Sequence, residues 1–271
     1  MAQVTFLGTG GGRWMVITQT RSTSGLWIEF DKTTIVVDPG PGWPLRVKQM
    51  ALDPRKIDGI LVTHAHIDHS DSVSVACEAM TQGGTKNRGV LIAPSDCLND
   101  KSPVILPYLR DRIKEIHTLE LATTYTIGGV EISAVHKHDH KTVETYGLFL
   151  STPAANLALV VDGVFHEEMI SSYNGVGDKD LMILHTTMAE DGYRVGHLDF
   201  QTAEYLIAGT KPNHAVLTHF GLRAHDSFPE SIANEISKKT GVRVTASYDG
   251  LTLPFGKAVG RERKRLDAFL D

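Results

Sequence analysis

The segment with the clearest chemistry is Thr63-His64-Ala65-His66-Ile67-Asp68-His69, which places three imidazoles and one carboxylate close together. Neutral imidazoles and carboxylates are the ligands that Zn²⁺ and similar ions take in proteins. In a turn that leaves a strand, His64 and His66 can point at one ion, and Asp68 and His69 at a second. A solvated turn is the alternative, but a chance match at all four positions is rare even with 13 His. We therefore predict a metal centre here.

The elements around this segment follow from apolar and alternating stretches. The run Ile57-Asp58-Gly59-Ile60-Leu61-Val62 predicts a buried strand, and its C-terminal end is where α/β sheets place their sites. Further strands are expected at residues 4–7, 25–30, 33–37, 90–93, 116–121, 125–127, 130–135, 146–151, 157–161, 181–184, 215–218, 242–246 and 251–254. Helices are expected at residues 45–52, 72–80, 107–113, 200–208 and 229–238. The glycine-rich residues 8–12 predict a tight turn with no helix after it.

Three more places offer ligands, each directly after an expected strand. They are the segment of residues 135–140 with three histidines, Asp162 after Val160-Val161, and His219 after Leu217-Thr218. Taken singly, an Asp after a strand is commonly a turn cap, and a His is commonly a packed, hydrogen-bonded residue. A site for two ions needs more than four ligands, so these three places are the candidates for the rest.

The H-x-H-x-D-H motif after an apolar strand resembles the signature of metallo-β-lactamase fold hydrolases. Phe6-Leu7-Gly8-Thr9-Gly10 and Val37-Asp38-Pro39-Gly40-Pro41-Gly42 are similar to the ribonuclease Z-like branch of that family, and the resemblance extends from residue 4 to about residue 220. It implies an α/β fold, a four-layer αββα sandwich. We find no linker and expect one domain over residues 1–271.

The resemblance also implies a ligand set for two divalent ions. The first ion would take His64, His66 and one histidine of residues 136–140, the second would take Asp68, His69 and His219, and Asp162 would bridge them. The family ligand usually lies six or seven residues before a glycine that opens the next strand. Gly147 lies seven residues after His140, so His140 is expected, with His138 second and His136 third. Zn²⁺ is the first expectation, although such sites also accept Mn²⁺, Fe²⁺ or Ni²⁺.

His197 is the candidate for proton transfer. Asp199 is the expected N-cap of the helix at residues 200–208, so His197 lies in the loop before that helix. In ribonuclease Z-like enzymes a His at this place, with Ala six residues later (here Ala203), protonates the leaving oxygen. The family shows His-Ser-Thr where this chain has His197-Leu198-Asp199, so a catalytic and a packing role both stay open.

Three other polar residues near the motifs have an expected structural role. His185 lies where relatives often carry an acidic residue, and we expect a buried structural histidine in preference to a site residue. Arg223 and His225 follow the His219 motif and could meet an anionic substrate, but ordinary surface positions are favoured.

These features predict hydrolysis of a phosphodiester, with Asp68 orienting the nucleophile as well as binding metal and His197 as general acid. His66 supports hydrolysis, because redox di-iron relatives commonly carry Glu there. Transfer RNA is not expected: the interval of 162 − 140 = 22 residues has no room for the long arm of the processing enzymes, and the net charge is −5. A small phosphodiester, a cyclic phosphate or a short oligonucleotide is favoured. A lactone or thioester hydrolase is the alternative, and a non-catalytic metal-binding protein is the alternative from another class.

Composition adds further limits. With 41% hydrophobic and 22% charged residues, no apolar run of membrane-span length and no signal-like N-terminus, the chain is expected to be cytoplasmic and without a membrane partner. Cys77 and Cys97 are expected to be buried thiols. The basic residues 257–265 are expected to form a solvated tail or helix face. Relatives often dimerise, but no stretch identifies an interface.

Overall fold

Two seven-stranded sheets face each other in the computed structural model, which describes residues 2–99 and 103–257. The first sheet consists, in spatial order, of β14 (Thr252–Phe255), β1 (Ala2–Phe6), β2 (Leu26–Phe30), β3 (Thr33–Val37), β4 (Ile57–Leu61), β5 (Val90–Ala93) and β6 (Glu115–Thr118). The second consists of β13 (Arg243–Ala246), β12 (His214–Thr218), β11 (Leu181–His185), β10 (Asn156–Val160), β9 (Thr145–Ser151), β8 (Val130–His138) and β7 (Thr124–Ile127).

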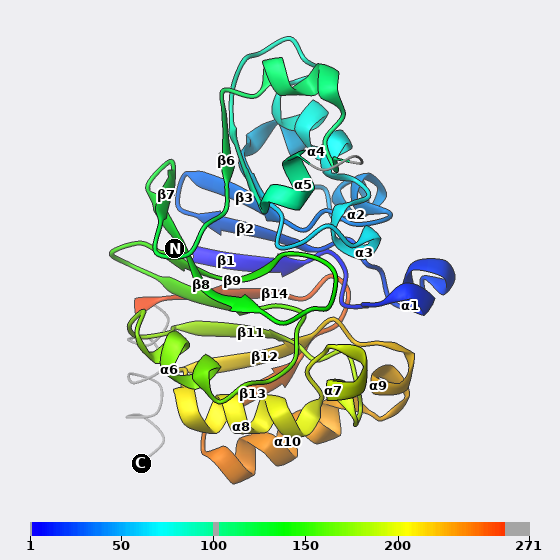
Figure 1. Ribbon diagram of the computed structural model, residues 1–271, viewed down its shortest axis with the longest axis vertical. Helices are drawn as coiled ribbons and strands as arrows, with labels where there is room; N and C mark the ends of the chain where they lie inside the picture. The colour runs from blue at the N-terminus through cyan, green and yellow to red at the C-terminus, as the bar shows by residue number, and fades with distance from the viewer. Residues whose placement is uncertain (1, 100–102, 258–271) are drawn as a thin grey trace.

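Helices cover the outer face of each sheet (Figure 1). The first sheet is covered by α2 (Trp43–Gln49), α4 (Val73–Met80) and α5 (Ser95–Asn99), and the second by α6 (Glu168–Asn174), α8 (Phe200–Thr210) and α10 (Pro229–Thr240). Two 3₁₀ helices, Pro54–Lys56 and Pro107–Arg112, complete the first half. The order helix, sheet, sheet, helix is the expected four-layer αββα sandwich.

Three apolar cores hold these layers together, because side chains alternate between the two faces of each strand. Phe6, Ile28 and Leu157 belong to the core between the sheets, where both inner faces meet. Trp27 points the other way and packs with the helices of the first sheet, and Leu184 packs with those of the second. Most strands are therefore buried on both faces, which explains why they read as apolar runs in the sequence.

The expected strands are all present, with ends shifted by a few residues. Residues 140–162 contain only the β9–β10 hairpin, as the short interval predicted. Two expectations are wrong. A helix, α1 (Arg13–Thr18), does follow the glycine-rich turn, and β8 extends to His138, so that His136 and His138 lie inside the strand instead of after it.

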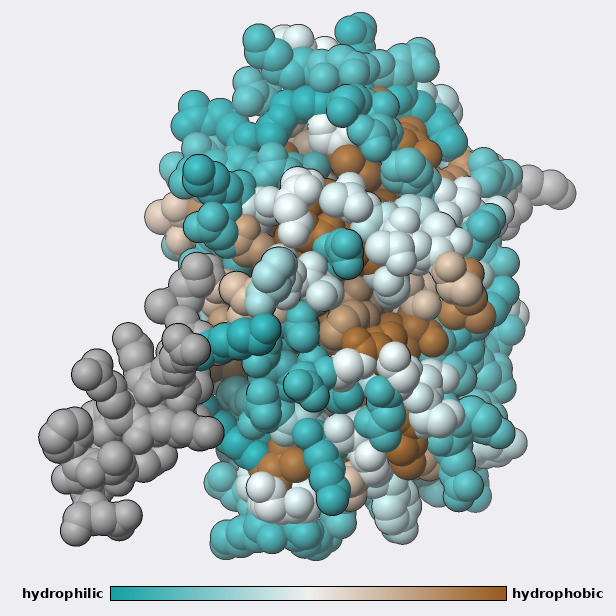
Figure 2. All heavy atoms as spheres, turned by 90° about the vertical axis from the view of Figure 1, so that its left-hand side faces the viewer, coloured by the Kyte–Doolittle hydropathy of each residue, from teal (hydrophilic) through white to brown (hydrophobic). Residues whose placement is uncertain are grey.

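Among the described residues, six α-helices were not expected. Two of them, α5 and α6, cover the outer faces of the sheets. The other four are α1, α3 (Ile67–Ser70), α7 (Gly192–Val195) and α9 (Leu222–Asp226). In Figure 1 they lie at the right-hand edge of the molecule, where β1, β4, β11 and β12 end. The opposite edge carries the turns of the β2–β3, β7–β8 and β9–β10 hairpins. Figure 2 shows that apolar residues gather across the middle of this edge. A hollow of about 300 Å³ opens there beside Asp31, Gly129 and Pro153.

Cys77 and Cys97 are free and buried, as expected. Among residues 2–99 and 103–257, no helix is both long and apolar enough to cross a membrane. The expectation for the basic segment of residues 257–265 lies, apart from Lys257, outside the described residues.

Candidate metal centre

The candidate ligands meet at one edge of the sandwich, because each follows or ends a strand that points there. His64 follows β4, His140 follows β8, Asp162 follows β10 and His219 follows β12. Strands β10, β11 and β12 are parallel to one another, so their C-terminal ends share that edge. Asp68 and His69 lie in the short helix α3 directly after β4.

The carboxylate of Asp162 lies at the centre of this group and is buried. Its Oδ2 atom lies 3.4 Å from His69 Nε2, 3.5 Å from His197 Nδ1, and 3.9 Å from both His64 Nε2 and His140 Nε2. Its Oδ1 atom lies 3.2 Å from His219 Nδ1 and 3.3 Å from His185 Nδ1. One carboxylate thus contacts histidines from both halves of the chain.

We call His64, His66 and His140, the predicted ligands of the first ion, the first ligand group. His140 Nε2 lies 3.0 Å from His66 Nδ1, and the three residues have ligand atoms within 4.8 Å of one another. His140 donates from Nδ1 to the carbonyl oxygen of Gly196 over 2.7 Å, so that in the neutral ring Nε2, which faces His66 and Asp162, is the nitrogen without a hydrogen.

We call Asp68, His69 and His219, the predicted ligands of the second ion, the second ligand group. Asp68 Oδ2 lies 3.6 Å from His69 Nε2 and 3.3 Å from His219 Nε2. The backbone N–H of Gly12 donates to the same oxygen over 2.7 Å, so the glycine-rich turn after β1 fixes this carboxylate.

Asp38 orients the second group from behind. Its Oδ2 atom lies 2.9 Å from His69 Nδ1 and accepts a 2.7 Å hydrogen bond from the hydroxyl of Thr63. Its Oδ1 atom accepts a 2.7 Å hydrogen bond from the backbone N–H of Thr63. A histidine that donates from Nδ1 to a carboxylate presents Nε2 to a metal, and such outer partners fix the tautomer. Asp38 lies in one of the segments that carry the family resemblance, but its contact with His69 was not predicted from the sequence.

The side chains fit a metal centre by a further observation. His64 Nε2, His69 Nε2 and His219 Nε2 are buried and have no hydrogen-bond partner, as is His197 Nδ1. Three of these atoms face the Asp162 carboxylate, and His219 Nε2 faces that of Asp68. A buried polar atom without a partner costs about 1–3 kcal/mol, so four such atoms in one place require an explanation. Binding of cations by these His and Asp side chains would explain these atoms. The structure brings the seven predicted ligands together, and their role as ligands stays a prediction.

For most of these residues, the surroundings favour the protonation state that binds metal, which is a neutral imidazole or an ionised carboxylate. Burial lowers the pKa of His64 well below its usual value and that of His140 to about 4, which keeps both imidazoles neutral. Burial opposes ionisation of Asp162, but His219 and His197 outweigh it and hold the pKa of that carboxyl well below its ordinary value. His69 differs: burial is outweighed by Asp68 and Asp38, which raise its pKa well above normal, so ion binding there must displace a proton.

The structure places the two alternative ligands away from the centre. His136 Nδ1 lies 3.1 Å from the hydroxyl of Ser172, and His138 Nε2 lies 3.1 Å from that of Tyr173, both on α6. Alternation along β8 turns these two side chains toward that helix, so the geometry favours His140 among the three.

His197 lies beside the centre, partly exposed, with its ring 4.8 Å from that of His140. Asp199 caps α8 as expected: it accepts from the backbone N–H of Thr202 in a capping box. Arg223 is exposed on α9, and His225 is partly buried and accepts a 2.9 Å hydrogen bond from Arg21.

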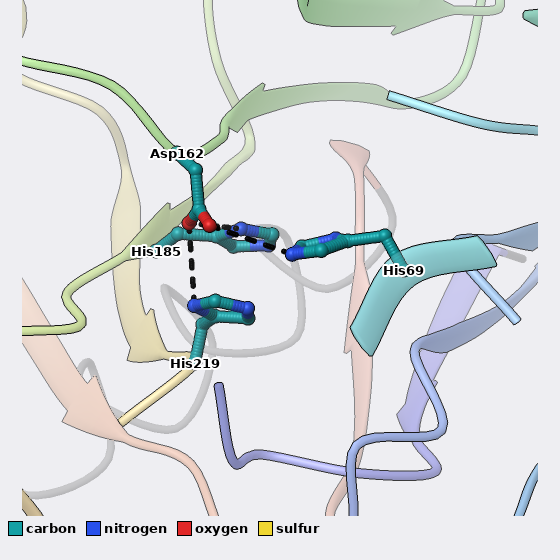
Figure 3. A group of neighbouring side chains, drawn as sticks. All are labelled: His69, Asp162, His185 and His219. Carbon is teal, nitrogen blue, oxygen red and sulfur yellow. Dashed lines mark hydrogen bonds and ion pairs between the residues drawn. The ribbon is translucent and has the colours of Figure 1, made fainter. Parts of the chain in front are cut away.

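His185 was expected to be a buried structural histidine, but the structure places it within the candidate centre. It contacts Asp162, and its ring stacks on that of His219 with centroids 4.4 Å apart and an angle of 7° (Figure 3). The missed signal was topological: His185 ends a parallel strand that lies between two strands whose own ends carry predicted ligands.

A family model described as the Beta-lactamase superfamily domain matches residues 33–220. That match spans most of the chain, so the chain belongs to this superfamily, and its fold and histidine motif are those of the metallo-β-lactamase fold. MJ1374, an uncharacterized protein of Methanocaldococcus jannaschii, is 29% identical over 254 residues, which cover 92% of this chain and 93% of that protein. Ribonuclease Z of Clostridium novyi is 36% identical over 111 residues, which cover 40% of this chain and 35% of that enzyme.

Two solved structures support the fold. The metallo-β-lactamase fold protein YhfI from Bacillus subtilis superposes with a TM-score of 0.77 at 18% identity, covering 93% of this chain and 98% of YhfI. A diphosphatase from the PhnP family gives a TM-score of 0.70 at 18% identity, covering 94% and 98%. At this level of identity the two structures bear on the fold alone.

Proposed function

We propose that this protein is a hydrolase that uses two metal ions to cleave a small phosphodiester, a cyclic phosphate or a short oligonucleotide. The observation that carries the proposal is the shared position of Asp162 Oδ2, which lies within 3.9 Å of histidine nitrogens from both ligand groups. A carboxylate oxygen in that position can hold two cations side by side. Zn²⁺ is the favoured ion, and Mn²⁺, Fe²⁺ and Ni²⁺ suit the same donors.

Each side chain has a defined task in this proposal. His64, His66 and His140 would hold one ion, Asp68, His69 and His219 the other, and Asp162 both. When bound, the two ions supply Lewis acidity that lowers the pKa of water and stabilises negative charge on phosphoryl oxygens. Asp68, fixed by the Gly12 N–H, would also orient the attacking water.

His197 is assigned the proton that the leaving oxygen needs. Its Nδ1 atom lies 3.5 Å from Asp162 Oδ2, and its backbone N–H is bound to the carbonyl oxygen of Gly192 over 3.0 Å. The capping box of α8 fixes the loop from the other side. A partly exposed imidazole held at the rim of the centre can pass a proton to a leaving alkoxide and regain one from solvent.

A similar enzyme, the short interval between His140 and Asp162, and the net charge of the chain bear on the choice of substrate. Ribonuclease Z, which is similar to part of this chain, acts on RNA by name, which favours a phosphate ester here. Residues 140–162 hold only the β9–β10 hairpin, and the chain carries a net charge of −5, so a large RNA has little to bind to.

A lactone or thioester is the second candidate, because apolar side chains are exposed on the short helices at the site edge. Trp14 on α1 is 66% exposed, Tyr193 on α7 is 77% exposed, and Ile67 and Leu222 are exposed on α3 and α9. Such side chains suit the acyl portion of a substrate as well as an aromatic group on a phosphodiester.

Turnover of bis-p-nitrophenyl phosphate, measured against a lactone and a thioester panel, tests the proposal. We expect hydrolysis of the phosphodiester that stops with a chelator and returns with Zn²⁺ or Mn²⁺. Chelator-sensitive turnover of lactones or thioesters alone would replace the proposal with the second candidate. No turnover of any substrate by metal-loaded protein would favour a non-catalytic metal-binding role.

A further inference from the structure

We propose that His185 is a positioning residue of the metal centre: its Nδ1–H holds Oδ1 of Asp162, so that Oδ2 alone faces both ligand groups. This role rests on the proposed function, because it presupposes that Asp162 binds both ions. It concerns a residue outside the predicted ligand set, at the end of β11.

The two oxygens of Asp162 have different surroundings. Oδ2 lies between histidines of the first and the second ligand group, at 3.9 Å from His64 and 3.4 Å from His69. Oδ1 points away from these nitrogens and toward His185 and His219, at 3.3 and 3.2 Å. The carboxylate therefore offers one oxygen to the ions and the other to the protein.

His185 is the better placed of the two partners of Oδ1. An ionised carboxylate only accepts hydrogen bonds, so the nitrogen that contacts it must carry the hydrogen. His219 Nδ1 has another partner, the hydroxyl of Thr187 at 3.0 Å, and its Nε2 faces Asp68 in the second ligand group. The hydrogen bond of His185 Nδ1 is to Asp162.

The fold holds the His185 ring in this orientation. The residue is 5% exposed, and its backbone is paired in register with Thr218, one residue before His219. The rings of His185 and His219 are stacked at 4.4 Å, and the ring of His69 lies 5.5 Å away (Figure 3). Rotation of His185 away from Asp162 would break the stack and press the ring into its buried surroundings.

The consequence concerns metal affinity. Without a donor at Oδ1, the Asp162 carboxylate can rotate about its Cβ–Cγ bond and no longer presents one oxygen to both ions. Loss of an outer hydrogen-bond partner of a metal ligand typically weakens binding about 10- to 100-fold. The structure therefore assigns to His185 a share of the affinity for both ions.

The test compares His185→Phe with His185→Gln in the full chain. Phe keeps a flat ring that can stack on His219 but removes the donor, whereas the Gln amide can still donate to Oδ1. Each chelator-stripped protein is titrated with Zn²⁺ for stoichiometry and Kd and with Co²⁺ for its visible absorption spectrum, and no turnover is measured. Should His185→Phe fail to fold, His185→Leu removes the donor with a smaller side chain.

We expect two ions per chain in all three proteins, with affinity reduced about 10- to 100-fold in His185→Phe and restored toward wild type in His185→Gln. The Co²⁺ spectrum of His185→Gln should match that of the wild type. Wild-type affinity in His185→Phe would overturn the proposal and leave a packing role. Equal losses in both variants, with a changed Co²⁺ spectrum, would overturn it in favour of His185 as a direct ligand. Absence of metal from the wild type would instead contradict the proposed function.

Discussion

Asp38 is not a predicted ligand, but it orients residues of the metal centre through hydrogen bonds. It is buried, its backbone has a positive φ of 50°, and its carboxylate fixes both Thr63 and His69. His219, a predicted ligand, also has a positive φ, of 61°. Such backbone conformations are costly for residues other than glycine and persist where the surrounding structure enforces them.

Asp38→Asn is predicted to weaken binding of the second ion. The Asn amide nitrogen would face His69 Nδ1, so the imidazole hydrogen would move to Nε2, the atom meant for the metal. We expect about a 10- to 100-fold higher Kd for one of the two ions in a Zn²⁺ titration. Asp58→Asn is the matched control, because Asp58 pairs with Arg88 on the same sheet. Equal effects of the two variants would show that Asp38 acts only on stability.

His197→Ala is predicted to lower kcat by about 10²- to 10⁴-fold on a phosphodiester with an alkoxide leaving group. On bis-p-nitrophenyl phosphate the loss should be much smaller, because p-nitrophenolate leaves without a proton. Steady-state kinetics on the two substrates checks this, with His117→Ala on β6 as the control. Equal losses on both substrates would contradict the role as general acid and indicate that His197 binds metal or substrate.

At the scale of elements, the glycine-rich turn between β1 and α1 is packed against the centre. A Cβ atom on Gly11 would lie 2.1 Å from the His219 ring, far closer than atoms can approach. The next residue, Gly12, donates to Asp68. The turn therefore needs glycine for its close approach to His219, whereas the sequence predicted only a tight turn here.

Gly11→Ala is predicted to displace His219 and to reduce Zn²⁺ binding toward one ion per chain. Gly129→Ala is the matched control, since no atom lies within 4 Å of the Cβ position at that glycine and its φ is not in the left-handed region. Metal analysis after dialysis measures the difference. Full occupancy in Gly11→Ala would show that the turn tolerates the methyl group and does not position His219.

The elements also mark the limit of what the sequence predicts. Strands such as β4 and β11 were expected because they are buried on both faces and read as apolar runs. The short helices α1, α3, α7 and α9 were missed, because helices of four to six residues have little intrinsic stability and form through tertiary contacts. His140 was chosen by its spacing to Gly147, whereas His185 needed the strand order, which the sequence does not state.

For the whole molecule, the buried Cys77 thiol links the free energy of unfolding to pH. Cys77 lies on the inner side of α4 among apolar side chains. Burial raises the pKa of its thiol from 9.0 to about 12, with a smaller contribution from Glu78. The folded state therefore keeps the proton between pH 9 and pH 12, where the unfolded chain releases it.

The stability contributed by Cys77 is thus complete below pH 9 and is lost as the pH rises toward 12. Wild-type protein should lose about 1.4 kcal/mol of unfolding free energy per pH unit in this range beyond the loss in Cys77→Val. Urea unfolding of both proteins at several alkaline pH values checks this. Parallel pH profiles would mean that the thiol is already accessible to solvent in the folded state.

The proposed metal centre depends on Asp162 holding two cations at one edge of the sandwich. Elemental analysis of purified wild-type protein and of Asp162→Ala tests it most directly, with circular dichroism to verify folding. We expect about two ions per wild-type chain and one or none in the folded variant, because the oxygen shared by both ligand groups is lost. No stoichiometric metal in wild-type protein under metal-replete conditions, or two ions retained in Asp162→Ala, would contradict it.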